Sequence, residues 1–326
     1  MTILRESPLI SVIVPNYNYA CYMKERMDSI LNQTFQDFEI IILDDASTDD
    51  SPQIIDQYRS LPQVSLIVIN EMNSGTPFKQ WQKGVRMARG KYIWIAEADD
   101  VADRNFLETT VSLMEKHPET SICHVGYAVI DSQSNVSRKD YNKWGRRRAK
   151  RYACFDGVEY VKHNLYWRNC IYNASGVLFR RDKAISIADS SFATMRYCGD
   201  WRFWIDLSLS GEVIEVYKVL NYFRRHGESV THSGNQYGRI LKEEISMVRY
   251  MQEILDGFSS YKKCIRGAIF YKRISRMPYE ANIKKDLYCY LKQELHIRFW
   301  HFVIERISKY LSAIFPFMLT PKRDRL

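Results

Sequence analysis

The sequence predicts an α/β fold: a mostly parallel β-sheet with helices on both faces, followed by a helical C-terminal extension. Two observations predict it. Short apolar runs alternate with segments of helical periodicity over about the first 130 residues, an order typical of a parallel sheet. From about Gln236 the pattern is helical to the end of the chain. Because 326 residues exceed the usual size of one domain, we expect one large core and a smaller appendage.

Each expected element has its own signal. Runs rich in Ile and Val predict strands at 9–15, 38–45, 64–70, 91–100 and 121–130. Apolar residues at helical spacing predict the intervening helices, at 22–33, 52–59, 78–88 and 104–117, and Pro52 suits a first helical turn. The second half is less regular, with strands expected at 174–180 and 212–226 and a helix at 199–210.

Polar residues gather where three of the expected strands end. They are Asn16-Tyr17-Asn18 after the first strand, Asp44-Asp45 after the second, and Glu97, Asp99 and Asp100 after the fourth. Sheets of this type bind ligands beyond the carboxyl ends of their strands, where the strand order reverses. The sequence therefore predicts one site on this rim of the sheet.

Composition and charge bound the compartment and the partners. Seven scattered cysteines, an odd number without a CxxC pair, argue against a disulfide framework and a structural zinc site, and indicate a reducing compartment. No basic segment followed by a long apolar stretch opens the chain, so we expect a cytoplasmic protein. Residues 261–326 hold 15 Lys and Arg against 5 Asp and Glu, a surplus of ten that accounts for the net charge of +9.

Missing motifs disfavour several enzyme classes. The chain has neither GxGxxG nor GxxxxGK[ST], which argues against a dinucleotide oxidoreductase and a P-loop NTPase. Its His and Cys residues never cluster at metal-ligand spacing, so a zinc hydrolase is poorly supported.

The acidic group Glu97, Asp99 and Asp100 suits a hard divalent cation, Mn²⁺ or Mg²⁺. Such ions take few protein oxygens and fill their other positions with water and substrate phosphates. A metal bound to a diphosphate would offset the repulsion among the three carboxylates. The alternative is a helix N-terminus that carries acids, which the helix dipole favours.

The motifs SVIVPNYN, ILDDASTDDS, NSG (73–75) and MARGKYIWIAEADD, in this order, resemble the nucleotide-sugar-binding half of family 2 glycosyltransferases, which are inverting enzymes of the GT-A fold. The resemblance covers about residues 8–130 and continues more weakly to about residue 232. We therefore expect a catalytic domain at 1–232, with a nucleotide-sugar-binding half at 1–130 and an acceptor-side half at 131–232. A basic helical region would follow at 233–326.

The resemblance implies roles for the nucleotide side of the rim. Pro15 and Tyr17 match positions that line the uracil pocket, and Asp45 matches the carboxylate that hydrogen-bonds the base. Asp44 is expected to be structural. Lys79 stands where many relatives have a different sequence, and it is either a point charge for the diphosphate or an exposed helix lysine.

Within the acidic group, Asp99 and Asp100 match the Asp-x-Asp-type element of the family. The resemblance places Asp99 near the ribose, with Asp100 as the direct ligand of Mn²⁺ or Mg²⁺ and Asp99 beside the metal. Glu97 stands where many relatives have Asp, and its role is left open.

The acceptor side is implied by YCGDWRFWIDL, which resembles the family's acid followed by aromatics. Asp200 is expected to be the catalytic base, and its alternative role is that of a helix N-cap. Trp201 and Trp204 are expected either to contact a sugar or to pack in the core.

The motif FRRHGESVTH resembles the family segment that closes over the diphosphate. His226 is expected to ligate the metal or contact phosphate, with Arg225 and Ser229 at the diphosphate.

The expected function is metal-dependent transfer of a sugar from a nucleotide-diphosphate sugar, a UDP-sugar in the first instance, to a hydroxyl of a saccharide or of a polyprenyl-diphosphate-linked acceptor in cell-surface polysaccharide synthesis. The alternatives are a sugar-nucleotide nucleotidyltransferase and a non-catalytic basic membrane-binding module. The basic, aromatic segment 296–326 is either an interfacial helix at the cytoplasmic face of the inner membrane or a helix packed on protein, and we expect no nucleic-acid partner.

Overall fold

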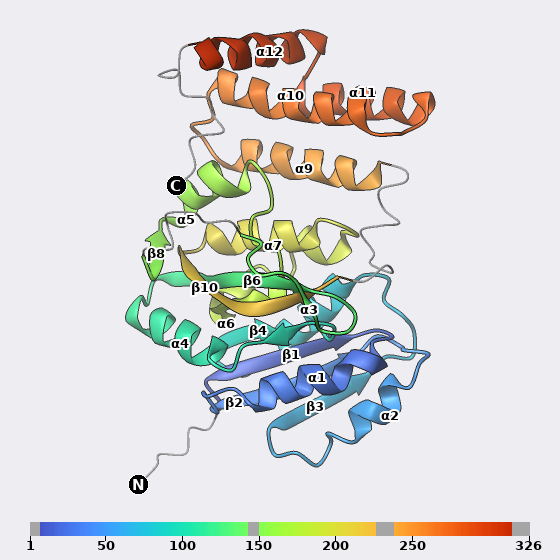
Figure 1. Ribbon diagram of the computed structural model, residues 1–326, viewed down its shortest axis with the longest axis vertical. Coiled ribbons are helices and arrows are strands. Elements are labelled where there is room, and N and C mark those ends of the chain that lie inside the picture. The colour runs from blue at the N-terminus through green and yellow to red at the C-terminus, as the bar shows by residue number, and fades with distance from the viewer. Residues whose placement is uncertain (1–6, 143–149, 226–237, 315–326) are drawn as a thin grey trace. The chain divides into compact units, whose positions relative to one another are not determined.

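The computed structural model describes residues 7–142, 150–225 and 238–314 of the chain (Figure 1). The chain divides into two compact units. Unit 1 comprises Met1–Gly157 and Ile171–His226, and unit 2 comprises Val158–Cys170 and Gly227–Leu326. The boundary expected after residue 232 falls among residues 226–237, outside the described part, and stays a prediction.

Unit 1 is an α/β structure, which confirms the predicted fold class. Its strands are β1 Ile10–Asn16, β2 Phe38–Asp44, β3 Val64–Ile69, β4 Tyr92–Ile95, β5 Val101–Ala102, β6 Thr120–Ile130, β7 Val136–Arg138, β8 Tyr152–Phe155, β9 Val177–Arg180 and β10 Glu212–Arg224. Its principal helices are α1 Ala20–Leu31, α2 Ser51–Asp56, α3 Pro77–Met87, α4 Phe106–Lys116, α6 Arg181–Ser186 and α7 Gly199–Ser208.

The strand order is β3-β2-β1-β4-β9-β6-β10-β5, with β7 beside β6 and β8 beside β10. Strands β1 to β4 are parallel, and so are β6 and β10. The short strand β9 lies between β4 and β6 and runs antiparallel to both. Because the chain moves from β3 across to β4 on the other side of β1, the strand order reverses at β1, and the polar rim lies at the ends of β1, β2 and β4.

Alternation along the strands sends side chains to two apolar layers. Val12 and Val14 of β1 belong to a buried cluster with Met27 of α1, Ile55 of α2 and Phe106 of α4. This cluster packs one face of the sheet with three helices.

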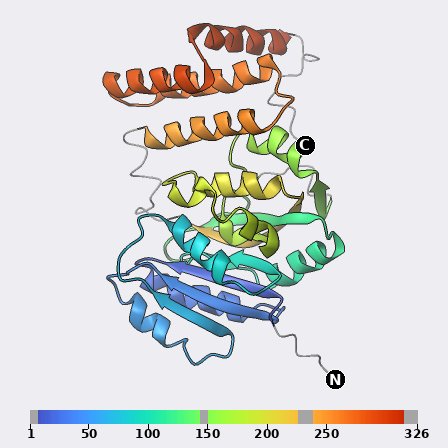
Figure 2. The same cartoon turned by 180° about the vertical axis from the view of Figure 1, so that it is seen from behind.

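The opposite face is covered by α3 and α7 (Figure 2). Gly84 of α3 lies so close to β1 that a Cβ there would stand 2.5 Å from Ile13 Cγ2. Phe203 and Trp204 of α7 pack their rings on Phe179 of β9 at 5.4 and 5.9 Å. These contacts fix α3 and α7, which carry several of the expected site residues.

Unit 2 is helical, with α9 Arg239–Ile254, α10 Ser260–Arg276, α11 Ala281–Leu295 and α12 Phe299–Ile314. The segment Val158–Cys170 also belongs to unit 2, and Tyr166 joins it to the helices. Its hydroxyl accepts a hydrogen bond from Gln252 of α9 at 2.7 Å, its carbonyl accepts one from Arg266 of α10 at 2.8 Å, and its ring stacks on Phe258 at 4.2 Å. Across the described ranges, no helix combines the length and the apolar character that crossing a membrane requires.

Gly90 generates a prediction for stability, because it lies against the backbone of β1. A Cβ at Gly90 would stand 2.6 Å from both Ile10 C and Ser11 N, and backbone atoms cannot move aside cheaply. We expect Gly90→Ala to lower the free energy of unfolding by about 1–3 kcal/mol in urea denaturation. Gly176→Ala is the matched control, since its Cβ would meet nothing closer than 3.5 Å. Equal stability of the two variants would contradict this packing.

Candidate active site

Asp44 ends β2 and holds the rim together from within. Its carboxylate is fully buried and accepts hydrogen bonds from Asn16 Nδ2 at 2.7 Å, Ser47 N at 2.9 Å and Ser47 Oγ at 2.6 Å. A carboxylate so enclosed by protein donors links the ends of β1 and β2. These contacts support the expected structural role.

Asp45 organises the next loop. It is 4 % exposed, and its carboxylate accepts hydrogen bonds from Asn70 Nδ2 at 2.8 Å, Ser74 Oγ at 2.7 Å, Ser74 N at 3.0 Å and Gln80 Nε2 at 2.7 Å. A carboxylate offers about four acceptor positions. A base bound by Asp45 would therefore share its oxygens with these protein donors. Tyr17, just beyond β1, is 44 % exposed and leaves a ring face open beside this rim.

Lys79 lies on the exposed side of α3. Its Nζ donates a hydrogen bond to the backbone carbonyl of Ser74 at 2.9 Å. The ammonium group therefore stays at the mouth of the loop that encloses Asp45, where its charge is accessible to solvent.

Asp100 is the most deeply buried of the three acids that follow β4, with 1 % exposure. Its Oδ2 accepts from Asn173 Nδ2 at 2.8 Å and Ser175 Oγ at 2.7 Å, and its Oδ1 accepts from the Arg224 backbone N–H at 3.0 Å. Burial, and next the Asp99 carboxylate, raises the pKa of the Asp100 carboxyl. The buried charge is thus incompletely compensated by these three donors.

Glu97 shares this environment. Its carboxylate accepts a hydrogen bond from Trp81 Nε1 at 2.8 Å, and its backbone N–H donates to Ser175 Oγ at 3.1 Å. Burial, and next the Asp99 carboxylate, raises the pKa of Glu97 to about 8. A cation bound near these two acids would stabilise their ionised forms and lower both pKa values.

Two buried arginines face this acidic group. Arg26 of α1 is fully buried, lies 4.7 Å from the Trp94 ring centre, and finds no hydrogen-bond partner for its guanidinium nitrogens among the described residues. Burial lowers its pKa to about 10, while Asp100 and its neighbouring acids oppose that shift. Arg224 donates from Nε to the Asp99 carbonyl at 2.7 Å and from Nη2 to Glu25 at 2.6 Å.

The donor set of the rim fits a hard divalent cation. The three side chains that end β4 offer carboxylate oxygens alone, without sulfur or imidazole, which is the ligand chemistry of Mn²⁺ and Mg²⁺. A dication would also favour the ionised forms of Glu97 and Asp100, whose pKa values burial and the Asp99 carboxylate raise. The residues present therefore fit the predicted metal.

Asp200 lies in the first turn of α7. A Cβ at the preceding Gly199 would stand 2.4 Å from Phe78 Cδ2 and 2.6 Å from the Phe192 carbonyl oxygen, so only glycine lets the helix begin here. Asp200 is half-buried, and its Oδ1 accepts a hydrogen bond from the Trp201 backbone N–H at 2.7 Å.

Trp81 links α7 to the acidic group. Its indole N–H reaches Glu97, while its ring packs on Phe203 at 5.8 Å and on Trp204 at 5.7 Å. One side chain of α3 thereby touches both the acidic group and the helix whose first turn contains Asp200.

The two tryptophans that follow Asp200 are buried. Trp204 is fully buried among Trp81, Phe179 and Phe203, so the structure supports core packing rather than a sugar contact. Trp201 is 3 % exposed, and its indole N–H has no partner among the described residues.

Arg225 is exposed at the end of β10, where its Nη2 donates to the Tyr141 hydroxyl at 3.0 Å and its guanidinium lies 4.8 Å from the Tyr141 ring centre. The predicted residues His226 and Ser229 lie outside the described residues.

Three positioning residues were missed by sequence reasoning. Asn173 and Ser175 precede β9, and Arg224 ends β10, and all three hold the loop of Asp99 and Asp100. Only Arg224 carried a signal, because it stands next to Arg225 in FRRHGESVTH. Asn173 and Ser175 had none, since 73 and 75 residues separate them from Asp100.

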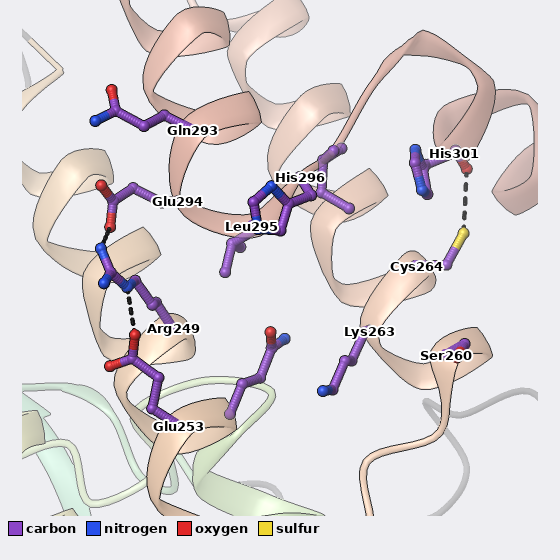
Figure 3. A pocket seen from close by; sticks show the side chains of 12 residues that line it. Arg249, Glu253, Ser260, Lys263, Cys264, Gln293, Glu294, Leu295, His296 and His301 are labelled. Carbon is purple, nitrogen blue, oxygen red and sulfur yellow. Dashed lines mark hydrogen bonds and ion pairs between the residues drawn. The ribbon is translucent and has the colours of Figure 1, made fainter.

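Apart from the rim, a polar pocket with a volume of about 550 Å³ lies in unit 2 (Figure 3). The ends of α9 and α11 and the first turns of α10 and α12 line it. Arg249 bridges Glu253 at 2.6 Å and Glu294 at 2.7 Å on one wall, and His296 and His301 lie across from them. No residue of the predicted site lines this pocket.

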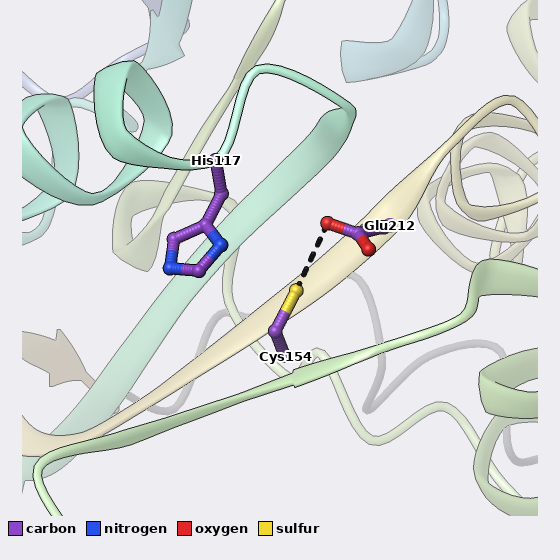
Figure 4. A group of neighbouring side chains, drawn as sticks. All are labelled: His117, Cys154 and Glu212. Atoms are coloured by element: carbon purple, nitrogen blue, oxygen red, sulfur yellow. Dashed lines mark hydrogen bonds between the residues drawn. The ribbon is translucent and has the colours of Figure 1, made fainter.

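A third polar group comprises His117, Cys154 and Glu212, whose ligand atoms lie within 4.8 Å of one another (Figure 4). The Cys154 thiol donates to Glu212 Oε2 at 3.1 Å. Burial, and next the Glu212 hydrogen bond, raises the pKa of Cys154 to about 12. The group therefore holds a neutral thiol, which is not the form that ligates metals, and it stands where β10 begins rather than on the predicted rim.

Comparison with known proteins points to one family. Residues 11–185, more than half of the chain, match Glycosyl transferase family 2. An uncharacterized glycosyltransferase of Haemophilus influenzae is 25 % identical over 262 residues, which cover 77 % of each chain. The putative teichuronic acid biosynthesis glycosyltransferase TuaG of Bacillus subtilis is 32 % identical over 123 residues, 38 % of this chain and 48 % of its own. The chain thus spans most of one relative and about half of the other.

Two solved structures show the fold. TarS 1–349 of S. aureus, in complex with UDP-GlcNAc, has a TM-score of 0.61 at 18 % identity and covers 82 % of this chain and 73 % of its own. The mannosyltransferase PcManGT of Pyrobaculum calidifontis, in complex with GDP-Man and Mn2+, has a TM-score of 0.55 at 16 % identity and covers 94 % and 86 %. The catalytic fold is therefore of the GT-A type, as the sequence predicted.

The raised pKa values predict how metal binding depends on pH. Protonated carboxyls do not ligate a cation, and the pKa of Glu97 is about 8 while that of Asp100 also lies above its usual range. Mn²⁺ affinity should therefore rise as pH increases from 6 to about 8.5, with protons released on binding. Calorimetry of Mn²⁺ binding in buffers of different ionisation enthalpy measures both effects. Affinity that falls or stays constant over this range would refute the assignment.

Proposed function

The chain belongs to glycosyl transferase family 2, an inverting family, and from that premise we propose metal-dependent transfer of a sugar from a UDP-sugar to a saccharide hydroxyl in cell-surface polysaccharide synthesis. The observation that carries the proposal is the acidic group at the end of β4, which offers only oxygen ligands and in which the half-buried Glu97 and the buried Asp100 have raised pKa values. The likeness to TuaG, a putative teichuronic acid biosynthesis glycosyltransferase, supports polysaccharide synthesis as the setting.

The nucleotide would lie beyond the carboxyl ends of β1 and β2. Tyr17 offers an exposed ring on which a base can stack beside the buried edge of Pro15, and Asp45 offers carboxylate oxygens to the base. The complexes of TarS with UDP-GlcNAc and of PcManGT with GDP-Man support a nucleotide-diphosphate sugar as the donor class. UDP is our choice because the motifs that resemble the uracil pocket are present in register.

Asp100, with Asp99, would hold Mn²⁺ or Mg²⁺, as the Mn2+ complex of PcManGT supports. When bound, the metal supplies positive charge that stabilises the diphosphate as it leaves. Asp99 would also contact the ribose. Asn173, Ser175 and Arg224 orient the Asp100 carboxylate by their hydrogen bonds, so that little reorganisation is needed on binding.

The remaining cations would surround the diphosphate. Lys79 at the mouth of the Asp45 loop and Arg225 at the end of β10 are both exposed and contribute positive charge there. His226 and Ser229 complete this set in the proposal, with His226 on the metal or on a phosphate.

Asp200 would act as the base of the inverting step. It accepts the proton of the acceptor hydroxyl while the hydroxyl oxygen attacks the anomeric carbon from the face opposite the leaving diphosphate. The Asp200 carboxylate is only half-buried, which leaves it accessible to an acceptor. Trp201 directly follows Asp200 and is the tryptophan kept for the sugar contact, because it is 3 % exposed whereas Trp204 is fully buried.

The acceptor in this proposal is a saccharide, either free or carried on a polyprenyl diphosphate lipid. A lipid-linked acceptor would place the reaction at the cytoplasmic face of a membrane. Donor and base positions do not depend on this choice, because they come from unit 1.

Substitution of the two acids separates donor binding from chemistry. We expect Asp200→Asn to lower kcat by at least about a hundredfold and leave Mn²⁺-dependent UDP binding intact. Asp100→Ala should weaken that binding itself and cost about 3 kcal/mol of transition-state stabilisation. Calorimetry with UDP and Mn²⁺ and a UDP-release assay measure both. Asp206→Asn removes another acid of α7 and serves as the control; near wild-type rates in Asp200→Asn would remove Asp200 as the base.

The donor class has its own test. With Mn²⁺ present, we expect UDP-sugars to be hydrolysed or transferred at least about tenfold faster than GDP-sugars, because a base contact at Asp45 would distinguish uracil from guanine. UDP-sugars should also be preferred over dTDP-sugars, because the ribose contact proposed for Asp99 would lose a hydroxyl in the deoxyribose. UDP that binds only without Mn²⁺ would contradict the metal dependence. Formation of a nucleotide-sugar from a sugar phosphate and a nucleoside triphosphate, with release of diphosphate, would favour a nucleotidyltransferase instead.

A further inference from the structure

Helix α12 has one face fixed against unit 2. Phe302 stacks on Tyr271 of α10 with ring centres 5.6 Å apart, and the Tyr261 hydroxyl hydrogen-bonds Ser308. Glu305, between them on the same side, is 8 % exposed. These contacts settle which side of α12 faces inward.

The opposite face of α12 is apolar and exposed. Its largest side chains keep much of their surface in solvent, namely Phe299 at 54 %, Trp300 at 70 %, Ile304 at 45 %, Ile307 at 54 % and Tyr310 at 70 %. Phe299 stands at the edge of this face, where its ring also contacts Tyr271 with ring centres 6.1 Å apart. At about 3.6 residues per turn, these five together with Val303 and Leu311 form a continuous apolar arc of roughly 140°. We name the seven residues the α12 apolar face. Isolated exposed apolar residues are ordinary, but a continuous stripe of this width marks an interaction surface.

The charge around this face indicates its partner. Arg306 borders the arc, Arg298 precedes the helix, and both are exposed. Glu305, the one acid of α12, is buried, whereas Arg306 and Lys309 are exposed, so the exposed charges of this helix are all positive and complement an anionic occupant. An apolar helix face with Trp and Tyr, bordered by basic residues, is typical of a helix in the plane of a bilayer surface.

We propose that the α12 apolar face docks into the surface of an anionic phospholipid bilayer, with the helix axis parallel to the membrane. Trp300, Ile304 and Ile307 enter the boundary between headgroups and acyl chains, and Arg298 and Arg306 stay at the level of the lipid phosphates. The helix lies on the membrane and does not cross it, in agreement with the absence of a spanning helix among the described residues. The binding is reversible, because it depends on one helix face and a few charges.

This surface goes beyond sugar transfer and does not require it, since docking needs neither donor nor metal. A lipid-linked acceptor would gain from it, because acceptor and enzyme would then meet on the same two-dimensional surface. Failure of docking would leave the assignment of Asp100 and Asp200 untouched.

The test is sedimentation of the full-length protein with vesicles of phosphatidylcholine, with or without phosphatidylglycerol. We expect clear binding to the anionic vesicles that weakens with salt. A variant with Trp300→Ser, Ile304→Ser and Ile307→Ser should lose at least about tenfold in partition coefficient. Arg298→Gln with Arg306→Gln should bind anionic vesicles at least about tenfold more weakly than the wild type and leave binding to neutral vesicles unchanged.

The control variant carries Ile185→Ser and Ile254→Ser, which replace exposed apolar residues outside α12 and should bind as the wild type does. Circular dichroism and donor hydrolysis without vesicles show that each variant is folded. The proposal is overturned if the wild type ignores both kinds of vesicle, if the α12 variant binds as well as the control, or if the substitutions instead abolish a dimer of the vesicle-free protein.

Discussion

The structure depends on one electrostatic constraint, which is that Glu97, Asp99 and Asp100 lie together at the end of β4. Burial and the repulsion among these carboxylates make their ionised forms less stable, and both effects raise the pKa values of Glu97 and Asp100. The buried guanidinium group of Arg26 opposes that cost in part, and the backbone N–H of Arg224 donates a hydrogen bond to Asp100. In the proposed function, a bound cation supplies the rest of the compensation.

The fold delivers this arrangement through its strand order. Because β9 inserts antiparallel between β4 and β6, the turn at Asn173–Ser175 is brought to the end of β4, where it binds Asp100. On the other side of the sheet, Trp81 joins Glu97 to the aromatic layer of α7. The acidic group and the helix that begins near Asp200 are therefore parts of one packed structure within unit 1, and substitution of Trp81 in α3 would disturb both.

The first half of the fold was predictable because its periodicity is strong, and each expected strand and helix up to residue 130 is present. The strand expected at 91–100 ends at Ile95, and the chain then turns, with the Asp100 backbone N–H hydrogen-bonded to the Glu97 carbonyl at 3.2 Å. A strand was expected at 174–180, but its antiparallel place between β4 and β6 could not be foreseen. The hydrogen bonds from Asn173 and Ser175 to Asp100 could not be foreseen either, because they join residues more than 70 positions apart. Arg26 looked like one more residue of an amphipathic helix, and only packing against Trp94 shows that it is buried beside the acids. The burial of Trp204 was left open by the sequence, since an aromatic residue after an acid suits both a sugar and a core.

The central claim is that the acids ending β4 bind a cation together with a nucleotide diphosphate. The most direct measurement is the anomalous diffraction of crystals grown with Mn²⁺ and UDP. The account predicts a manganese peak at ligand distance, about 2.2 Å, from an Asp100 oxygen and in contact with both phosphates of UDP. UDP bound to the intact protein with no manganese at this rim, or manganese bound elsewhere, would contradict it.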